Sequence, residues 1–300
     1  MGSILTAFSG NPLDRGDDIR DDPTILTERL MRSDSRILLY FEGAVFTFED
    51  NGELLWLFAD EVNPATFITV IYLGAMDDKF YYAAEIASPV DLPGKFRDPR
   101  SLATKLNAPH DDKGMLGIVA QSKSMLDWHK SHKHCAKCGS ESIISKAGYE
   151  RKCPACEALH YPRTDPVVIM LGLQDGKALV GRGYHYPEGI YSSLAGFMEP
   201  GEAIEEAVRR EMFEETSVIV GDVRYVASQP WPYPSSIMIG CHADIISGTA
   251  TADKKEVEEI RWITKDEARL AIAGDNSAGF LLPSSYAIAN QLIRSWLEKE

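Results

Sequence analysis

The sequence predicts a protein of mixed α+β and α/β class, with a β-rich domain over residues 1–125, a cysteine-rich segment over 126–163 and an α/β domain over 164–300. Three observations predict this organisation. Short β-branched and aromatic runs fill the first part, four cysteines stand in two pairs in the second, and strand-like and helix-like runs are mixed in the third. With 300 residues, of which 44% are hydrophobic, the chain can bury more than one core.

The first part alternates apolar runs with turn signals. We expect strands in RILLYFEGAVFTF (36–48), LLWLF (54–58), TFITVIYLG (66–74) and FYYAAEI (80–86). Asn51-Gly52 marks a tight turn between the first two runs. These features predict a mostly antiparallel β domain without a recognisable catalytic cluster, followed by a helix over roughly 113–130.

The cysteines have the spacing of metal ligands. Cys135 and Cys138 form one CxxC pair, and Cys153 and Cys156 form another after a gap of fourteen residues. Such pairs place four thiolates tetrahedrally, as structural Zn²⁺ requires, and a closed four-cysteine site leaves no position for chemistry. A redox pair is the alternative, and His132 and His134 stand near enough to be substitute ligands. The fifth cysteine, Cys241, is expected in a core.

The last part mixes strands and helices. Strands are expected in PVVIMLGL (166–173), KALVGRG (177–183), SIMIGCHADII (236–246) and VEEIRWI (257–263), with a turn at Asp175-Gly176. A helix over about 285–299 closes the chain. This order predicts an α/β or α+β domain.

The net charge of −14 argues against a protein that works mainly by binding nucleic acid or anionic membrane. An anionic substrate would therefore need positive charge at its site, most simply from metal ions. No stretch is apolar and long enough to span a bilayer. The start MGSILTAFSG lacks a basic n-region and matches only the loose myristoylation pattern, so cytoplasm is the expected location.

One helix carries acidic residues on its apolar side. Within GFMEPGEAIEEAVRREMFEETSV (196–218), a helix is expected over about 202–216. At 100° per residue, Glu211 and Glu215 fall at about 80° and 120°. This is the middle of an apolar stripe made by Ala203, Ile204, Ala207, Val208 and Met212. Two carboxylates facing the protein repel each other unless cations compensate, and such oxygen ligands suit Mg²⁺ or Mn²⁺. The other interpretation, a solvated acidic face, fits Glu205, Glu206 and Arg209.

This segment resembles the Nudix box, G-x5-E-x7-R-E-U-x-E-E-x-G-U, where U is aliphatic. The matching residues are Gly196, Glu202, Arg210, Glu211, Met212, Glu214, Glu215 and Val218. The one departure is Ser217, which replaces the glycine that ends the helix in a left-handed conformation; serine there should cost about 1 kcal/mol. The resemblance implies an α/β/α sandwich with a mixed sheet.

The resemblance also implies an activity. Nudix hydrolases cleave a nucleoside diphosphate linked to another group, with two or more divalent ions. Glu211 and Glu215 would hold the metals, Arg210 would orient a box carboxylate, and Glu202 would fix the geometry of the loop and helix. Glu214 is either a further ligand or the base that takes the proton from water.

The stretch SQPWPYPSS (228–236) resembles the motif S-Q-P-W-P-x-P-x-S of the NADH pyrophosphatase branch of this family. Its three prolines exclude a central strand and predict a stiff loop carrying two rings. The resemblance implies substrate contacts from Ser228, Gln229, Pro230, Trp231, Pro232, Tyr233, Pro234, Ser235 and Ser236. A surface polyproline segment that binds nothing, or docks a partner, is the alternative.

Further positions follow from the same resemblance. Tyr161 is expected to contact substrate, Phe197 to stack on a base, and the backbone of Ala195 to help hold a metal. A last metal-binding glutamate should be one of Glu256, Glu258 and Glu259, and the spacing favours Glu256. Ala289 aligns with a substrate-lining position.

The resemblance as a whole implies a homodimeric NADH pyrophosphatase that produces reduced nicotinamide mononucleotide and AMP. NAD⁺ would be a poorer substrate, and NAD-capped RNA a further one. Two alternatives stay open. One is a Nudix enzyme for ADP-ribose or diadenosine polyphosphate, and the other is a zinc-ribbon nucleic-acid-binding protein with an inactive hydrolase half.

Overall fold

The computed structural model describes residues 4–22, 24–106, 108 and 114–298. The chain forms two compact units. The first unit contains the chain up to Ala7, Asp165–Pro230 and the chain from Ser236 onward; the second contains Phe8–Thr164 and Trp231–Ser235. The division at Asp165 lies beside the predicted border at 163/164. No division occurs at the predicted border after residue 125, because one helix, α2 (Met115–Ser131), runs across it.

The second unit is built around a six-stranded sheet with the order β4-β5-β1-β2-β6, and β3 also pairs with β1. Its strands are β1 (Ser35–Phe41), β2 (Ala44–Thr47), β3 (Trp56–Leu57), β4 (Phe67–Met76), β5 (Lys79–Ile86) and β6 (Lys95–Arg97). All pairs are antiparallel except β1 with β5. The mostly antiparallel domain is therefore confirmed, although a turn at Glu42-Gly43 divides the run 36–48 into two strands.

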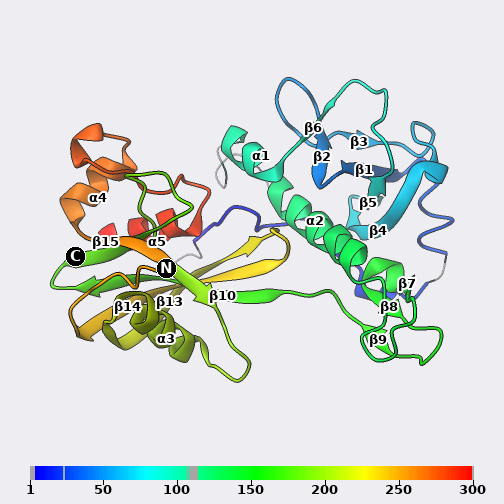
Figure 1. The fold of residues 1–300 in the computed structure, drawn as a ribbon. Coiled ribbons are helices and arrows are strands. Elements are labelled where there is room, and N and C mark those ends of the chain that lie inside the picture. The colour runs from blue at the N-terminus through cyan, green and yellow to red at the C-terminus, as the bar shows by residue number, and fades with distance from the viewer. Residues whose placement is uncertain (1–3, 23, 107, 109–113, 299–300) are drawn as a thin grey trace. The chain divides into compact units, whose positions relative to one another are not determined.

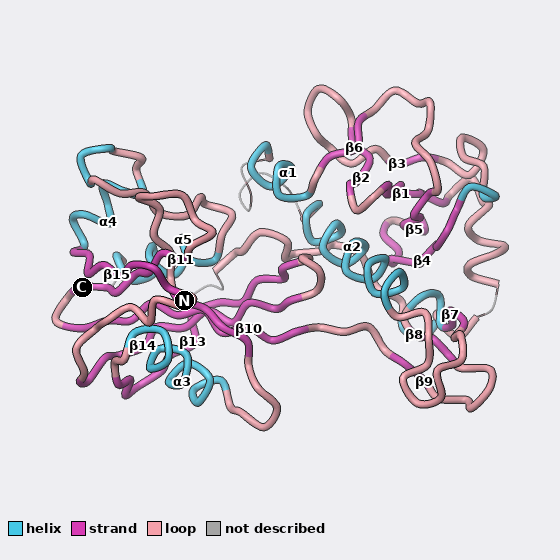
Figure 2. The backbone as a smooth tube through the Cα atoms, viewed as in Figure 1, coloured by secondary structure: helices cyan, strands magenta, loops and turns pink. Residues whose placement is uncertain are grey.

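Short helices and a long one complete this unit (Figure 2). They are the 3-10 helices η1 (Asp17–Ile19) and η2 (Pro64–Thr66), and the α-helices α1 (Pro99–Lys105) and α2 (Met115–Ser131). The predicted turn at Asn51-Gly52 is confirmed: Gly52 has a φ of 79°. The core between these elements contains large buried rings, including Tyr72 and Tyr82, each 0% exposed.

The cysteine-rich segment forms a small three-stranded sheet with the order β7-β8-β9. Its elements are β7 (Ile143–Ser145), η3 (Lys146–Gly148), β8 (Glu150–Lys152) and β9 (Leu159–His160). Arg151 of β8 is 6% exposed and donates to the Ser142 hydroxyl at 2.9 Å. On α2, His129 lies 3.2 Å from Arg151 and 2.8 Å from the Gly148 carbonyl. These buried hydrogen bonds fix the segment to α2.

The first unit contains a mixed sheet with the order β13-β14-β10-β11-β15, and β12 also pairs with β10. Its strands are β10 (Asp165–Gln174), β11 (Lys177–Gly183), β12 (Leu194–Phe197), β13 (Ile219–Trp231), β14 (Ser236–Ser247) and β15 (Val257–Thr264). β10 and β14 are parallel, whereas β10 pairs with β11 and β12 antiparallel. The expected strands and the mixed sheet are thus confirmed.

Helices cover both faces of this sheet (Figure 1). They are α3 (Ile204–Thr216), α4 (Lys265–Ile272), η4 (Asn276–Ala278) and α5 (Ile288–Leu297). Alternate residues of β10 face opposite cores, as a strand requires. Met170 packs in the core with α3, and Leu171 packs in the core with α4 and α5. This arrangement is the α/β/α sandwich that the resemblance implies, and Cys241, 0% exposed, belongs to the core beside α3.

The proline-rich stretch differs from the predicted loop. Its first four residues continue β13 to Trp231, and its last residue begins β14 at Ser236. Only the residues between them form the turn. Proline is tolerated in β13 because this strand lies at the edge of the sheet, where one side of its backbone needs no partner. Among the described residues, no helix is long and apolar enough to cross a membrane.

Candidate active site

The helix α3 carries the residues of the box. At its start, the carboxylate of Glu206 accepts a hydrogen bond at 2.7 Å from the N–H of Ala203, the residue before the helix. The predicted apolar stripe included Ala203, but this residue is exposed at the start of the helix, so that part of the prediction is wrong. At the other end, Ser217 has φ 61° and ψ 15°, the left-handed conformation expected for the glycine of the box. Ser217 therefore ends the helix in the same backbone conformation that glycine would adopt, at a cost in local strain.

Two carboxylates of α3 face the protein interior. Glu211 is 9% exposed and Glu215 is 6% exposed, whereas Glu205 and Arg209 of the same helix are exposed. Among the described residues, Glu215 Oε2 has no hydrogen-bond partner. Burial, with help from the charges of Glu211 and Glu256, raises the pKa of Glu215 to about 8. A buried carboxylate without a donor is costly, and a bound cation would remove that cost.

Glu211 lies directly over the backbone of β12. A Cβ atom at Gly196 would stand 1.9 Å from the carboxyl carbon of Glu211, so only glycine leaves room for this carboxylate. Burial raises the pKa of Glu211, although the neighbouring Arg210 opposes the shift. Ala195 precedes this glycine in β12 and pairs with Ile169 of β10. Gly196 thus allows the backbone of β12 to lie against Glu211, one of the two carboxylates of α3 that are expected to bind metal.

Arg210 connects the carboxylates of the box. Its Nε and Nη2 donate to the two oxygens of Glu202 at 2.6 and 2.9 Å, and Nη1 donates to Glu211 Oε1 at 2.7 Å and to Glu214 Oε2 at 3.1 Å. Nη2 also donates to the Phe197 carbonyl at 2.9 Å. The hydrogen bond from Arg210 lowers the pKa of Glu202 to about 2. Arg210 thus holds three carboxylates of the box in place, and its role in orienting one of them during the reaction stays a prediction.

The three glutamates near β15 have different environments. Arg182, 7% exposed, donates to Glu258 Oε2 at 2.7 Å and to Glu259 Oε2 at 2.9 Å. Glu259 also accepts from the Tyr191 hydroxyl at 2.8 Å. The charge of Glu256, in contrast, raises the pKa of both Glu211 and Glu215, because it lies near them. Glu211, Glu215 and Glu256 are called the carboxylate cluster below.

Asp253 positions the third member of this cluster, and sequence reasoning missed it. Its carboxylate accepts from the backbone of Glu256 at 3.2 Å and of Val257 at 2.9 Å. Its own N–H donates to the Glu215 carbonyl at 3.0 Å. The turn-forming pattern of an aspartate three residues before Glu256 was the available signal.

The four cysteines come together in the second unit. The Sγ atoms of Cys135, Cys138, Cys153 and Cys156 lie within 4.8 Å of one another. Cys135 and Cys156 are 3.6 Å apart, and Cys138 and Cys153 are 3.5 Å apart. Four thiolates around one Zn²⁺ would stand about 3.8 Å apart, so the donor set fits this ion.

His160 adds a hydrogen bond to this centre that the spacing of the cysteines could not show. Its Nε2 lies 3.3 Å from Cys135 Sγ. Burial opposes ionisation of Cys135, yet hydrogen bonds from backbone N–H groups and from His160 bring the pKa of this thiol down to about 6. These hydrogen bonds favour the thiolate form of Cys135, which is the form that zinc binds.

Gln229 of the proline-rich motif is fully buried and supports the fold. Its Nε2 donates to the carbonyls of Ala7 at 3.2 Å and Tyr286 at 2.7 Å, and its Oε1 accepts from Ile288 N, the first residue of α5, at 2.7 Å. The amide is 0% exposed and its groups are used within the fold, so the expected substrate contact of Gln229 stays a prediction.

The rings of the motif pack within the second unit. Trp231 and Tyr233 meet edge to face at 5.2 Å, and each contacts Phe8, at 6.0 and 6.3 Å. The Arg100 guanidinium lies 4.0 Å from the centroid of Tyr233. Both rings are half-buried, so part of each stays open. Of the other motif residues, Pro234 is exposed, Ser228 and Pro230 are half-buried, and Pro232, Ser235 and Ser236 are buried.

The remaining predicted residues differ in exposure. Tyr161 is 63% exposed in the second unit, and Phe197 is 62% exposed at the end of β12. Ala289 of α5 is 2% exposed and belongs to the core beneath the sheet. The residue as a whole therefore has almost no exposed surface, and its substrate contact stays a prediction.

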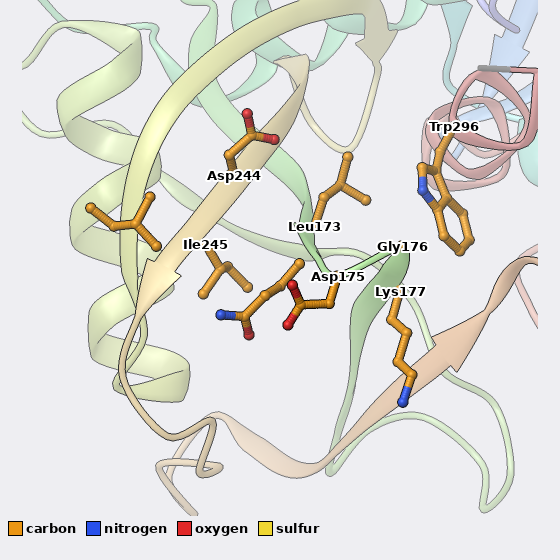
Figure 3. A pocket seen from close by; sticks show the side chains of 9 residues that line it. Leu173, Asp175, Gly176, Lys177, Asp244, Ile245 and Trp296 are labelled. Atoms are coloured by element: carbon orange, nitrogen blue, oxygen red, sulfur yellow. The ribbon is translucent and has the colours of Figure 1, made fainter. Parts of the chain in front are cut away.

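A cavity of about 470 Å³ lies elsewhere in the first unit, around the turn at Asp175-Gly176 (Figure 3). Leu173, Asp244 and Trp296 are among its lining residues. Asp244 is engaged in an ion pair with Arg224. No predicted site residue lines this cavity, so it does not compete with the carboxylate cluster as the site of chemistry.

Comparisons with known proteins place two domains on this chain. A family model described as "NUDIX domain" matches residues 162–282, and one described as "NADH pyrophosphatase zinc ribbon domain" matches residues 130–161. The "NAD-capped RNA hydrolase NUDT12" of Homo sapiens is 47% identical over 191 residues, which are 60% of this chain and 41% of that protein. The chain thus spans about two fifths of the length of that relative.

Two other relatives are matched over more of their length. The "NAD(P)H pyrophosphatase NUDT13, mitochondrial" of Homo sapiens is 34% identical, over 75% of this chain and 66% of that protein. The "NAD-capped RNA hydrolase NudC" of Stutzerimonas stutzeri (strain A1501) is 31% identical, over 76% of this chain and 77% of that protein. These matches extend beyond the box to most of the chain.

Proposed function

The chain belongs to the Nudix hydrolase family, in the branch that carries the NADH pyrophosphatase zinc ribbon, and from this premise we propose that it hydrolyses the pyrophosphate bond of NADH. The products are AMP and reduced nicotinamide mononucleotide. NAD⁺ is a poorer substrate, and the 5′ end of NAD-capped RNA is a further one. The observation that carries this proposal is the buried side chain of Glu215 beside Glu211, whose Oε2 has no hydrogen-bond partner within the described part of the chain.

The carboxylate cluster fits divalent metal ions. It offers oxygen donors only, which suit Mg²⁺ or Mn²⁺, and two or more ions would balance its negative charge. The proposed ligands are Glu211, Glu215, Glu256 and the backbone carbonyl of Ala195. When bound, such ions neutralise charge on the pyrophosphate and lower the pKa of water. In the second unit, the four cysteines would hold one Zn²⁺ for structure alone.

The other residues of the box orient the reacting groups. Water attacks one phosphorus, the bridging P–O bond breaks, and the proton of the water passes to a base. Glu214 is the proposed base, because its side chain is 57% exposed and reaches solvent, whereas Glu211 and Glu215 are buried. Arg210 holds Glu214 and Glu211 through one nitrogen, Nη1, and is itself fixed by Glu202. Preorganised groups of this kind lower the cost of reaching the transition state.

Ring faces recognise the substrate in this proposal. Phe197, exposed at the end of β12, stacks on a base. The substrate contacts expected of Tyr161, Trp231 and Tyr233 stay predictions from the resemblance. The proposal also includes a homodimer, which the family resemblance implies, and a cytoplasmic location, which reduced zinc-binding cysteines favour.

A substrate panel tests the proposal. NADH, NAD⁺, ADP-ribose and diadenosine polyphosphate are each incubated with Mn²⁺ or Mg²⁺, with EDTA as the control, and the products are separated by chromatography. The highest kcat/KM is expected for NADH. A metal-dependent preference for ADP-ribose or diadenosine polyphosphate would keep the Nudix chemistry and overturn the assigned substrate. RNA binding that persists in EDTA, without hydrolysis of any substrate, would favour the nucleic-acid-binding alternative.

The choice among the three glutamates near β15 gives a separate prediction. Glu256→Gln should lower kcat for NADH about a hundredfold or more, because a metal ligand is lost. Glu258→Gln should change kcat less than about threefold, because it removes one ion pair of Arg182 while Glu259 still pairs with that arginine. The readout is steady-state kinetics with Mn²⁺. Equal losses in the two variants would remove Glu256 from the ligand set.

A further inference from the structure

Two cations of the second unit lie close to the rings of the proline-rich motif. The Arg100 guanidinium, on α1, lies 4.0 Å from the centroid of the Tyr233 ring and 5.5 Å from that of Trp231. The Nζ atom of Lys123, on α2, lies 5.3 Å from the Tyr233 centroid. Because both charges stand near one ring, they are within about 9 Å of each other. Positive charge is therefore gathered around rings that the family resemblance assigns to the substrate.

Arg100 differs from the other described arginines that stack on rings. Each of those also pairs with a carboxylate or donates to a backbone carbonyl; they are Arg20, Arg29, Arg36 and Arg261. Arg100 is exposed, and within the described part of the chain its guanidinium has no hydrogen bond or ion pair. A guanidinium offers five N–H donors in a planar fork, which fits the oxygens of a phosphate. Arg100 therefore presents an unused anion-binding group beside the motif.

The acidic residues near these two cations are used elsewhere. Asp127 pairs with Lys123 one turn along α2, and the Lys123 side chain is 12% exposed. Asp98, two residues before Arg100, caps α1: its Oδ1 accepts from the backbone N–H of Arg100 at 2.9 Å. Neither carboxylate pairs with the Arg100 guanidinium. In a chain with a net charge of −14, a cation of this kind is a local exception that suits an anionic group.

The molecules that the proposed reaction can accept differ by one phosphate. NADH and NAD⁺ carry only the two phosphates of the pyrophosphate. NAD-capped RNA has a further phosphate on the 3′ oxygen of the adenosine ribose, where the RNA chain begins, and NADPH has one on the 2′ oxygen of the same ribose. Metal ions at the carboxylate cluster would serve the pyrophosphate, so the additional phosphate needs a cation of its own.

We propose that Arg100, supported by Lys123, binds a phosphate on the adenosine ribose of the substrate, which gives the β-rich second unit a role in substrate selection. This inference rests on the proposed function, because it concerns the substrates of that reaction. The fork of Arg100 donates two hydrogen bonds to the phosphate oxygens, and Lys123 adds a point charge. The rings of Trp231 and Tyr233 hold the guanidinium in place through cation–π contacts.

The test compares substrates with and without this phosphate. Arg100→Met removes the charge and keeps an unbranched side chain over the ring. Its kcat/KM should fall about tenfold or more for NADPH and for NAD-capped RNA, and less than about twofold for NADH and NAD⁺. Arg100→Lys, which keeps the charge without the fork, should lose less than Arg100→Met.

The matched control is another arginine of the second unit. Arg36 stacks at 4.1 Å from the centroid of Phe58, a ring outside the motif, so Arg36→Met should change none of the four values. A selective loss for only one of the two phosphate-bearing substrates would support the site and assign the phosphate to the 2′ or the 3′ oxygen. Equal losses for all four substrates, or no loss for NADPH and NAD-capped RNA, would overturn the proposal.

A binding measurement separates this inference from the proposed function. AMP, adenosine 2′,5′-bisphosphate and adenosine 3′,5′-bisphosphate contain no pyrophosphate bond, so calorimetry with Mn²⁺ proceeds without turnover. At least one bisphosphate should bind the wild type about tenfold or more tightly than AMP, and Arg100→Met should abolish this difference. If the difference is found in a protein that cleaves no dinucleotide, the proposed activity is wrong and the phosphate site stands. If both bisphosphates bind like AMP, the site is wrong, whatever the activity.

Discussion

Replacing Glu215 with glutamine should reduce hydrolysis of NADH at least about a thousandfold while the fold is kept. Glu215 is buried, and glutamine has nearly the same shape, so packing around α3 is preserved. What is lost is the negative charge and one metal-binding oxygen. The measurement is kcat with saturating Mn²⁺, together with Mn²⁺ affinity by calorimetry.

The same substitution should stabilise the metal-free protein at high pH. In the folded protein the pKa of Glu215 is raised from 4.5 to about 8 by burial and by the charges of Glu211 and Glu256. A raised pKa contributes stability that is fully present below about pH 4.5 and is lost as the pH rises through 8. At pH 9 the ionised carboxylate costs on the order of 5 kcal/mol, and glutamine avoids this cost.

Thermal unfolding in EDTA at pH 5 and pH 9 measures this effect. Glu215→Gln should unfold at a higher temperature than the wild type at pH 9 and at a similar temperature at pH 5. Addition of Mn²⁺ at pH 9 should stabilise the wild type and not the variant. The control is Glu205→Gln, an exposed residue of the same helix, which should leave activity and unfolding unchanged. Near-normal activity of Glu215→Gln would contradict its assignment as a metal ligand.

Replacing Cys153 with serine should release zinc and destabilise the second unit by several kcal/mol. Cys153 is 0% exposed, and its Sγ lies 3.5 Å from that of Cys138. Serine cannot supply the fourth thiolate, and the small sheet of the ribbon depends on the centre, because it has little core of its own. Zinc content by atomic absorption and the unfolding temperature should fall together.

A second buried cysteine provides the control for this experiment. Cys241 is also 0% exposed but lies in the core beside α3. Cys241→Ala should lower stability by about 1–2 kcal/mol through lost packing and should keep one zinc per chain. A Cys153→Ser protein with its full zinc content would show that the four-cysteine centre is wrongly assigned.

The sequence predicted the local features of the site well. The rotation of 100° per residue was enough to place Glu211 and Glu215 on the buried side of α3, because a helix fixes the direction of each side chain. The ribbon ligands followed from CxxC spacing for the same reason, since two short turns determine where the thiols point. The apolar runs identified the strands of both units.

Contacts between distant residues could not be predicted in this way. Arg182 binds Glu258 and Glu259 only because β11 pairs with β15, and that pairing leaves Glu256 as the glutamate near the buried pair. Gln229 was expected at the substrate, but it caps α5 through Ile288, which lies 59 residues away. A motif match indicates that a residue matters. It does not show whether that residue contacts a ligand or supports the fold.

The most direct test of the central claim is anomalous diffraction from crystals grown with Mn²⁺. We expect at least one Mn²⁺ within about 2.2 Å of Glu215 Oε2, with further oxygen ligands from Glu211 and Glu256. Manganese bound elsewhere, for example at Glu258 and Glu259, with the carboxylate cluster empty in crystals of active protein, would contradict it.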